Sequence, residues 1–470
     1  MIRRRFLEQA GLVAFGTLGP DCSVTASQRA SSARGCDEQS AQESAYVIFQ
    51  EGGIVRGVNA RTGKVEFEGK DARRVINETL NAAAAPGKTW KETVLIKGPI
   101  DLDLGPASWD PNRRSGIEVP NYTRLRIAGK ITLVANARSA PKQVNYIVTN
   151  KDHKTGRQIE IIGGEIDGNA ANNQHGIYGI QVSGATDVRI VGVYVHDCRE
   201  TGVAFENVSR NCWAVNNHVV GRKDLKLFWQ DGLGNQFDCH DIFYIGNVAE
   251  RCRFWGIYIE GGSNIVALGN VCHHNGRDGI IVGSGAHPGN SISVIGNTVY
   301  ENDQHGIRAH SAKASRGLII GNIARNNAAK GGRHSGIVVN CRDFCVQGNQ
   351  CWDDRPEKKQ EYGIALLAGA EHCQVNGNNV RANKLGGVLL QEGATQCHIH
   401  DNQGYRTESH GMAKGSSPIT IRHGLCSAPS AVQLTPRGPQ PVRLSYEADA
   451  IEIRIHHDAE LAEVCWQAKV

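Results

Sequence analysis

Two short stretches, Tyr244-Ile245-Gly246-Asn247 and Gly256-Ile257-Tyr258-Ile259, decide the fold because both recur along the chain. The first returns as Gly269-Asn270, Gly296-Asn297, Gly321-Asn322, Gly348-Asn349 and Gly377-Asn378, and Asn217 and Asn402 extend the series at its ends. Successive asparagines are 30, 23, 27, 25, 27, 29 and 24 residues apart. The second stretch, a glycine followed by apolar-any-apolar, recurs at Gly179, Gly202, Gly232, Gly256, Gly279, Gly306, Gly336, Gly363 and Gly387, although Asn235 stands in the second apolar place of the Gly232 copy.

This period predicts a solenoid in which each coil holds two short strands joined by turns. Leucine-rich repeats need a leucine framework that is absent here, and propeller blades need about 40 residues per repeat. A right-handed parallel β-helix fits the pattern, with each strand pairing to its copy one coil away at about 4.8 Å. Apolar side chains such as Ile257 and Ile259 are expected to fill the interior. The asparagines are expected to stack as a ladder that satisfies backbone groups at one turn.

The flanks of the repeat have the character of caps, which a solenoid requires. Residues 71–85 carry apolar positions at helical spacing, with Asp71 as N-cap, and predict a helix over the N-terminal end of the core. After Gly411 the period ends and alternating strands predict a small β module. The expected organisation is therefore an export signal and linker at 1–45, the β-helix with its cap at 46–411 and the β module at 412–470.

Composition excludes several classes of protein. The 470 residues are 40% hydrophobic and 21% charged, with a net charge of +5, so global disorder and a basic nucleic-acid-binding face are not expected. Outside the first 20 residues, no apolar run approaches the ~20 residues that cross a bilayer. The 14 cysteines are too sparse for a disulfide scaffold and lack zinc-ligand spacing. Cys212, Cys373 and Cys397 each precede a ladder asparagine by five residues, which predicts an interior column.

The N-terminus has the character of an export signal. Arg3-Arg4-Arg5-Phe6-Leu7 precedes a weakly apolar stretch and resembles a twin-arginine signal. The stretch 20–45 is rich in Ser, Ala and Gln and is expected to be a linker. The expected location is periplasmic, cell-surface or extracellular.

The repeat resembles the pectate-lyase-like superfamily of β-helix proteins over residues 70–405. That superfamily includes polysaccharide lyases, polygalacturonase-type hydrolases, alginate C5-epimerases and non-catalytic surface proteins. The stretch 163–169, GGEIDGN, resembles an early coil of the hydrolase branch, and 274–279 and 301–306 resemble two consecutive epimerase coils. The epimerase family's catalytic Asp-Pro-His corresponds here to Tyr258-Ile259-Glu260.

Outward-facing positions point to a candidate site. In each coil, the residues one before, two after and four after the repeat glycine are expected to share one outer face. Ionisable and aromatic residues concentrate in these columns on the four coils from Gly232 to Gly306. The candidate catalytic residues are Tyr258, Glu260, Asp278, His305, Arg308 and His310, and the candidate substrate-binding residues are Trp229, Asp231, Trp255 and His287.

Three functions remain open at this point, namely a lyase, a hydrolase and a protein that only binds. In a lyase, Arg308 would neutralise a uronate, and Tyr258, His305 or His310 would act as acid or base. In a hydrolase, Asp231 and Asp278 would lie two coils apart, about 9.6 Å, near the upper limit for inversion. Glu206 and Glu260 repeat that spacing in another column.

A binding protein would need only the aromatic and polar groups. No cofactor is required by the pattern, although Glu260 and Asp238 could bind calcium. The sequence therefore predicts an exported, monomeric protein that cleaves a polysaccharide, with uronate-containing polymers favoured, by β-elimination or inverting hydrolysis. Non-catalytic glycan binding is the first alternative, and mannuronan C5-epimerisation is the second.

Overall fold

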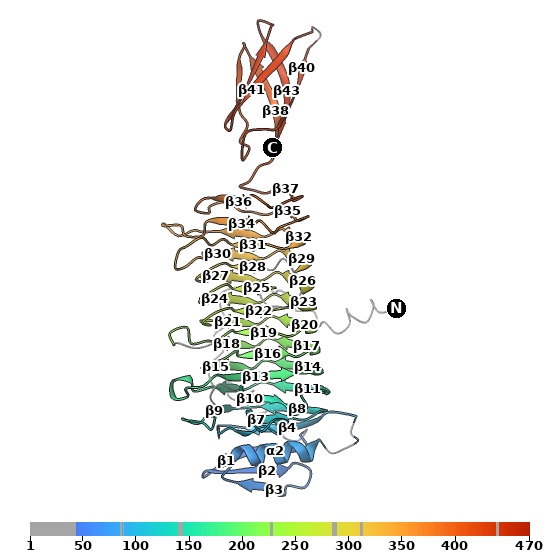
Figure 1. Ribbon diagram of the computed structural model, residues 1–470, viewed down its shortest axis with the longest axis vertical. Helices are drawn as coiled ribbons and strands as arrows, with labels where there is room; N and C mark the ends of the chain where they lie inside the picture. Colours follow the sequence, from blue (N-terminus) through green and yellow to red (C-terminus); the bar gives the residue numbers. More distant parts are fainter. Residues whose placement is uncertain are drawn as a thin grey trace, which may run out of the picture. The chain divides into compact units, whose positions relative to one another are not determined.

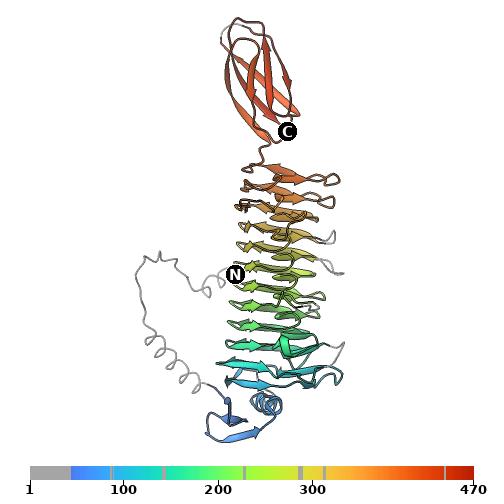
Figure 2. The same cartoon turned by 90° about the vertical axis from the view of Figure 1, so that its left-hand side faces the viewer.

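The computed structural model describes residues 44–84, 87, 89–139, 144–225, 229–283, 289–310, 314–438 and 441–470. The expected export signal therefore lies outside the described residues, apart from the last two residues of its 1–45 range. Most of the described chain winds through three long sheets whose strands stack coil upon coil (Figure 1; Figure 2). Neighbouring strands of consecutive coils are parallel throughout the repeat region, so the predicted parallel β-helix is confirmed.

Sheet A has the described strands, in spatial order, β3 (Val65–Gly69), β2 (Ile54–Asn59), β1 (Tyr46–Glu51), β4 (Glu92–Lys97), β8 (Thr123–Ile127), β11 (Gly156–Ile162), β14 (Ala185–Val191), β17 (Arg210–Val215), β20 (His240–Ile245), β23 (Gly262–Leu268), β26 (Gly289–Ile295), β29 (Ser315–Ile320), β32 (Arg342–Gln347), β35 (Gln374–Asn376) and β37 (His398–His400). Sheet B has β33 (Gln350–Trp352), β30 (Ile323–Arg325), β27 (Thr298–Tyr300), β24 (Val271–His273), β21 (Val248–Glu250), β18 (His218–Val220), β15 (Tyr194–His196), β12 (Glu165–Asp167), β9 (Lys130–Leu133) and β5 (Ile100–Leu102). Sheet C has β36 (Gly386–Leu390), β34 (Tyr362–Leu366), β31 (Ile337–Val339), β28 (Ile307–Ala309), β25 (Ile280–Val282), β22 (Ile257–Ile259), β19 (Leu233–Asn235), β16 (Val203–Glu206), β13 (Ile177–Ser183), β10 (Asn145–Asn150), β7 (Arg114–Val119) and β6 (Gly105–Pro106).

Each regular coil contributes three strands, not the two that the sequence predicted. The chain passes from sheet C to sheet A and then to sheet B before the next coil begins. The strand that the prediction missed is the sheet B strand, such as β24, which is only three residues long and follows the Gly-Asn turn directly. A three-residue strand has too few positions for an alternating pattern of its own, so it could not be separated from the turn.

The predicted asparagine ladder lies at the turn between sheets A and B. Asn247 donates from Nδ2 to Oδ1 of Asn270 at 2.9 Å, and Asn270 donates in the same way to Asn297 at 2.9 Å. The same bond links every successive pair from Asn217 to Asn402. Gly246, which precedes Asn247, has a φ of 64°, a left-handed conformation in which glycine carries no steric cost. The Gly-Asn pair therefore makes the turn and caps its backbone.

A second ladder, not predicted, lies at the turn from sheet B to sheet C. Asn275 donates to Asn302 at 2.9 Å and Asn302 donates to Asn327 at 3.0 Å. Gln360 and Asn383 continue the row. Between the ladders, one continuous core holds the inward side chains of all three sheets, including Ile257 and Ile259 as predicted.

The N-terminal helix is α2 (Ala72–Ala83), and Asp71 caps it by accepting a hydrogen bond from the Arg74 N–H at 3.0 Å. Its buried face, which includes Val75, Ile76 and Leu80, packs into the same core as the first coils. The helix lies at the β4 end of the stack, as predicted (Figure 1).

The C-terminal region forms two three-stranded antiparallel sheets around its own small core. Their strands are β38 (Glu408–Gly415), β39 (Ile419–Arg422), β40 (Ala431–Arg437), β41 (Leu444–Ala448), β42 (Glu452–His457) and β43 (Ala462–Lys469). The predicted small β module is confirmed.

The predicted cysteine column is interior. Cys212 and Cys373 are fully buried, and the partly buried Cys397 packs against the same core. All described cysteines are free thiols. They serve as small apolar filler in the solenoid.

Candidate functional site

The outer face of sheet C carries the column that the sequence predicted. Gly234 pairs with Tyr258, Tyr258 with Ile281 and Ile281 with Arg308 across four consecutive coils. The preceding column runs through Asp231, Trp255, Asp278 and His305, one residue before each repeat glycine. These side chains therefore face the same side of the solenoid.

Asp278 is the hub of this region. Its side chain is fully buried, and its Oδ2 accepts from Trp255 Nε1 at 3.0 Å and contacts Arg308 Nη2 at 3.0 Å. Its Oδ1 accepts the backbone N–H of His305 at 3.0 Å. Burial raises the pKa of Asp278, while Arg308 and the two hydrogen bonds oppose that rise. Arg308 thus gives part of its guanidinium to Asp278, and its buried Nε has no hydrogen-bond partner among the described residues.

An aromatic platform lies beside Asp278. The rings of Trp255 and Tyr258 stack at 4.9 Å between centroids, and Trp229 stacks on Phe254 at 5.4 Å. Arg277 lies over the Phe254 ring at 4.2 Å. Trp229 is 57% exposed, so its ring is open to a ligand, whereas Trp255 and Tyr258 are buried.

The two predicted histidines differ in their surroundings. His305 Nδ1 accepts the Ser335 N–H at 3.0 Å, so Nε2 carries the proton toward His334 Nδ1 at 3.3 Å. Burial and the neighbouring His334 hold the pKa of His305 well below its usual range. His310 is exposed, and partial burial together with Arg308 lowers its pKa. Neither histidine is a ready proton donor at neutral pH.

The remaining predicted residues are Glu260, Asp231 and His287. Glu260 is buried at 7% exposure, in the column four after the repeat glycine. Asp231 is 2% exposed and accepts the Trp255 N–H at 3.2 Å. His287 lies outside the described residues.

Three acidic residues, Glu200, Glu206 and Asp231, lie nearer the N-terminus than Asp278, and we call them the acidic cluster. The sequence had singled out Asp231 and Glu206, and it missed Glu200. Burial raises the pKa of Asp231 to about 7. Burial, followed by the nearby charges of Asp231 and Glu206, raises the pKa of Glu200 to about 8. Burial also raises the pKa of Glu206 against hydrogen bonds from Gln181 and Tyr178.

The coils that carry the acidic cluster have small outward residues in sheet C at Ala204 and Gly234. Ala204 and Gly234 pair with each other in the outward column that holds Tyr258 and Arg308 on later coils. Within the described residues, no member of the acidic cluster forms an ion pair with a Lys, Arg or His side chain. Glu206 lies four residues after Gly202, in the same column as Glu260, as the sequence had indicated. Glu200 lies in a turn, where the column rule cannot assign a residue to a column.

A chain of hydrogen bonds leads from the acidic cluster toward the N-terminal end of sheet C. Gln181 Nε2 donates to Glu206 at 2.9 Å, and Gln181 Oε1 accepts from Thr149 Oγ1 at 3.3 Å. The same hydroxyl contacts His153 Nε2 at 2.9 Å. The His153 ring stacks on Trp109 at 3.7 Å, and burial lowers its pKa to about 4.

The two candidate calcium ligands have different surroundings. Glu260 is buried, whereas the Asp238 side chain is half exposed and lies 3.5 Å from His240. Among the described residues, one group has the geometry to hold a metal ion, formed by Asp167, His196 and Asp197. Lys130 and Arg222 already pair with its carboxylates, at 2.8 and 2.6 Å. This group is a salt-bridge network on the sheet B side.

The comparisons with known proteins agree with this fold. A family model described as a right-handed β-helix region matches residues 237–404. No curated protein gave a significant match. In the described residues, no helix has the length and apolar character needed to cross a membrane.

Three solved structures are similar to most of the chain. The A-module of mannuronan C-5 epimerase AlgE6 from Azotobacter vinelandii is 16% identical with a TM-score of 0.53, covering 70% of this chain and 95% of its own. The adhesin PfbA of Streptococcus pneumoniae is 14% identical with a TM-score of 0.50, covering 72% and 87%. The tailspike gp61 of Pseudomonas phage phi297 is 10% identical with a TM-score of 0.53, covering 85% and 92%. The chain is therefore a right-handed parallel β-helix protein, a fold that an epimerase, an adhesin and a tailspike share.

Proposed function

We propose that the protein binds a polysaccharide along the outer face of sheet C and hydrolyses it at the acidic cluster. The observation that carries this proposal is the grouping of Glu200, Glu206 and Asp231, whose pKa values are raised by burial and which form no ion pair among the described residues, although the charges of Arg113 and Arg277 act on Glu206 and Asp231. A buried carboxyl group without an ion partner costs stability, and such groups are concentrated at catalytic sites. Glycoside hydrolysis needs one protonated and one ionised carboxyl group, and the acidic cluster supplies both near neutral pH.

The roles follow from the two pKa values. At pH 7, Glu200, with a pKa of about 8, keeps its proton, and Asp231, with a pKa of about 7, is about half ionised. Glu200 protonates the glycosidic oxygen as the bond from that oxygen to the anomeric carbon breaks. The Asp231 carboxylate takes a proton from water as the water oxygen bonds to that carbon. The net reaction adds one water across the glycosidic bond.

Hydrolysis at the acidic cluster is favoured over the Asp231 and Asp278 pair. Asp278 is fully buried and already contacts Arg308, so it offers no free carboxylate for a water molecule. The same contact already engages part of the guanidinium that an elimination would need for a uronate. The aromatic stack of Trp229 on Phe254 is an open surface of the kind on which sugar rings pack.

The proposal is tested by incubating the protein with a panel of pectins, alginates, glycosaminoglycans and neutral glucans. New reducing ends without new ultraviolet absorbance are expected on at least one polymer. Glu200→Gln and Asp231→Asn should each lower turnover on it by about 10³-fold, within the range for a general acid or base. Glu250→Gln, on the outer face of sheet B, is the matched control and should leave turnover unchanged.

The pH dependence gives an independent check. Activity should fall below about pH 7 as Asp231 takes up its proton, and above about pH 8 as Glu200 loses its own. Ultraviolet absorbance would instead mean elimination, and a changed uronate composition without new ends would mean epimerisation. Retardation of a glycan without any reaction would mean that the protein only binds it. Any of these three results refutes hydrolysis.

We also propose that the N-terminal part of the signal and linker range 1–45, residues 1 to about 30, directs export through the twin-arginine route and that the protein acts as a monomer outside the cytoplasm. The resemblance of Arg3-Arg4-Arg5-Phe6-Leu7 to the twin-arginine pattern supports this. The fold similarity to a surface adhesin agrees with an exterior location. The ranges 46–411 and 412–470 are proposed as two units of the exported chain.

A further inference from the structure

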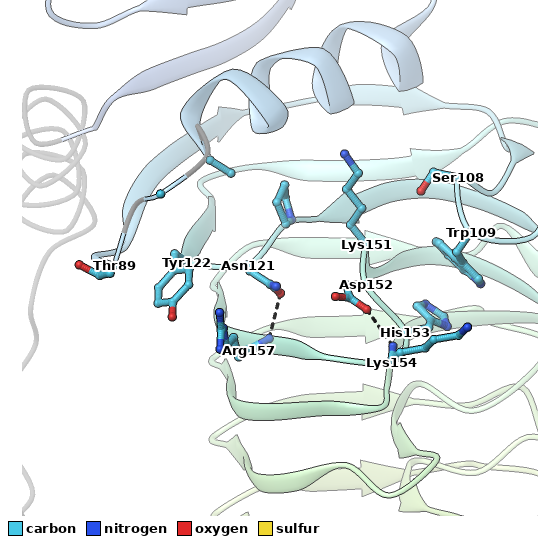
Figure 3. A pocket seen from close by; sticks show the side chains of 13 residues that line it. Thr89, Ser108, Trp109, Asn121, Tyr122, Lys151, Asp152, His153, Lys154 and Arg157 are labelled. Atoms are coloured by element: carbon cyan, nitrogen blue, oxygen red, sulfur yellow. Dashed lines mark hydrogen bonds between the residues drawn. The ribbon is translucent and has the colours of Figure 1, made fainter.

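A pocket of about 800 Å³ lies at the N-terminal end of the stack, between α2 and the first coils of sheets A and C (Figure 3). The turn from Lys151 to Arg157 lines it, with the Ser108–Trp109 loop at one side and the Asn121–Tyr122 turn at the other. Its volume lies within the range of small-molecule sites. None of the residues predicted to form the site belongs to it.

The charge of the lining is positive. Lys151, Lys154 and Arg157 contribute three cations, and Asp152 is the one described acid of the lining. Lys151 Nζ donates to the neutral Asn81 Oδ1 at 2.7 Å, so its charge is not compensated. Within the described residues, neither Lys154 nor Arg157 has an acidic partner.

Asp152 does not neutralise these cations, because its oxygens are used within the turn. Oδ1 accepts the N–H groups of Lys154 and Thr155, each at 2.9 Å, and Oδ2 accepts the Thr155 hydroxyl at 2.5 Å. Although partial burial alone would raise it, these hydrogen bonds lower the pKa of Asp152. The carboxylate is a fixed part of the turn that presents Lys154 and Arg157.

Aromatic rings complete the walls of the pocket. Trp109 is held in place by the stacked ring of His153, and Tyr122 lies 5.5 Å from the Arg157 guanidinium carbon. Figure 3 shows the Trp109 and His153 pair at one side of the lining and Tyr122 with Arg157 at the other. Flat rings beside cations suit a sugar that carries an anionic group, because the ring packs on the aromatic face while the anion meets the cation.

The pocket is physically linked to the acidic cluster. His153 lines the pocket and contacts Thr149, which bonds Gln181, which in turn bonds Glu206. Thr149 and Gln181 pair directly across β10 and β13 on the outer face of sheet C. A path of hydrogen bonds through buried side chains therefore joins the pocket to Glu206.

We propose that this pocket is a binding site for an anionic sugar unit, carrying a carboxylate or a sulfate ester, of the glycan that the acidic cluster acts on. The inference rests on the proposed function only for the identity of the polymer. The pocket selects the substrate by its negative charge. It does so away from the acidic cluster, because the carboxyl groups of that cluster would repel an anionic sugar. The neutral part of the sugar contacts Trp109 and Tyr122.

The test is isothermal titration calorimetry of the full chain with four probes. These are a trigalacturonate, a glucosamine 6-sulfate oligosaccharide, a neutral cello-oligosaccharide and inorganic sulfate. At least one anionic oligosaccharide should bind at least 10-fold more tightly than the neutral one. The two anionic arms distinguish a carboxylate from a sulfate ester.

Lys154→Ala combined with Arg157→Ala should weaken binding of the preferred anionic oligosaccharide by at least 10-fold. Arg210→Ala removes an exposed arginine of sheet A and is the matched control, which should bind as the wild type does. Equal affinity for the neutral oligosaccharide, unchanged binding by the double variant, or inorganic sulfate binding as tightly as the oligosaccharides would each overturn the proposal.

The same variants separate this inference from the proposed function. Asp231→Asn should keep the affinity for the anionic oligosaccharide although it loses turnover. The double variant should raise KM for the cleaved polymer with little change in kcat. Binding in the pocket without cleavage of any polymer refutes the proposed hydrolysis but supports the pocket as a binding site. Cleavage that the double variant leaves unchanged supports hydrolysis but refutes the role of the pocket.

Discussion

Asp231→Asn is expected to make the protein more stable at alkaline pH while it removes activity. Asp231 is 2% exposed, and burial raises its pKa from 3.8 to about 7. The folded state therefore binds the proton more tightly than the unfolded chain does. The stability that this proton provides is fully present below pH 3.8 and is lost as the pH rises through 7.

The magnitude follows from the shift of about 3 pKa units, at about 1.36 kcal/mol each. Above pH 7 the ionised Asp231 lowers the free energy of unfolding by about 4 kcal/mol relative to a group that does not ionise. At pH 5 the same linkage gives only about 1.5 kcal/mol. Asparagine retains the oxygen that accepts the Trp255 N–H, so the variant keeps this contact.

The assay is urea unfolding followed by circular dichroism at pH 5 and pH 8, for wild type and variant. Comparing the two proteins at each pH cancels the titration of all other groups. The advantage of the variant should grow by about 2–3 kcal/mol between pH 5 and pH 8. Asp343→Asn, at an exposed position of sheet A, is the control and should show no such growth. If Asp231→Asn is destabilised equally at both pH values, the carboxylate is a satisfied structural anion and cannot be the catalytic base.

Three further predictions test the asparagine ladder, the ion pair of Arg308 with Asp278 and the export signal. Asn297→Ala removes four ladder hydrogen bonds and should lower the free energy of unfolding by about 3 kcal/mol, as measured by urea unfolding; no change would show that the ladder is dispensable. Arg308→Ala leaves the buried Asp278 carboxylate unpaired and should cost about 3–5 kcal/mol at pH 8 and less at pH 5, whereas Arg308→Lys should recover part of the loss; equal stability of all three proteins contradicts a structural ion pair. Replacing Arg3 and Arg4 together by Lys should hold the protein in the cytoplasm, as judged by cell fractionation, and unchanged export would exclude the twin-arginine route.

The fold could be predicted because every coil of a solenoid has the same backbone conformation, so the residues that this conformation requires recur once per coil. Each Gly-Asn turn needs a left-handed residue followed by a side chain that bonds along the axis, and both demands recur. The same register predicted that Tyr258 and Arg308 belong to one outward column, and the strand pairing confirms it. The sheet B strands were not found, because three residues between two turns leave no pattern to detect.

The candidate site was only partly predictable, because register does not determine which side chains pair. Arg308 and Asp278 belong to adjacent columns, and only the course of the side chains brings them to 3.0 Å. Glu200 lies in a turn whose length varies from coil to coil, so column counting could not place it. The pocket is built by α2 and irregular early coils, which have no repeat to align.

Repetition itself argues for the acidic cluster as the place where chemistry occurs. Neighbouring coils share one backbone, so stability alone would favour the same kind of side chain in each column, as it does in the apolar interior and in the asparagine ladders. Beside Ala204 and Gly234, buried carboxyl groups gather on consecutive coils instead. Gly234 itself costs no packing, because Tyr258 on the next coil lies against it. Buried acids without an ion pair resist ionisation and lower stability. An unfavourable choice at this location, in a scaffold that repeats favourable ones along its interior and its ladders, supports the proposal of a reaction there.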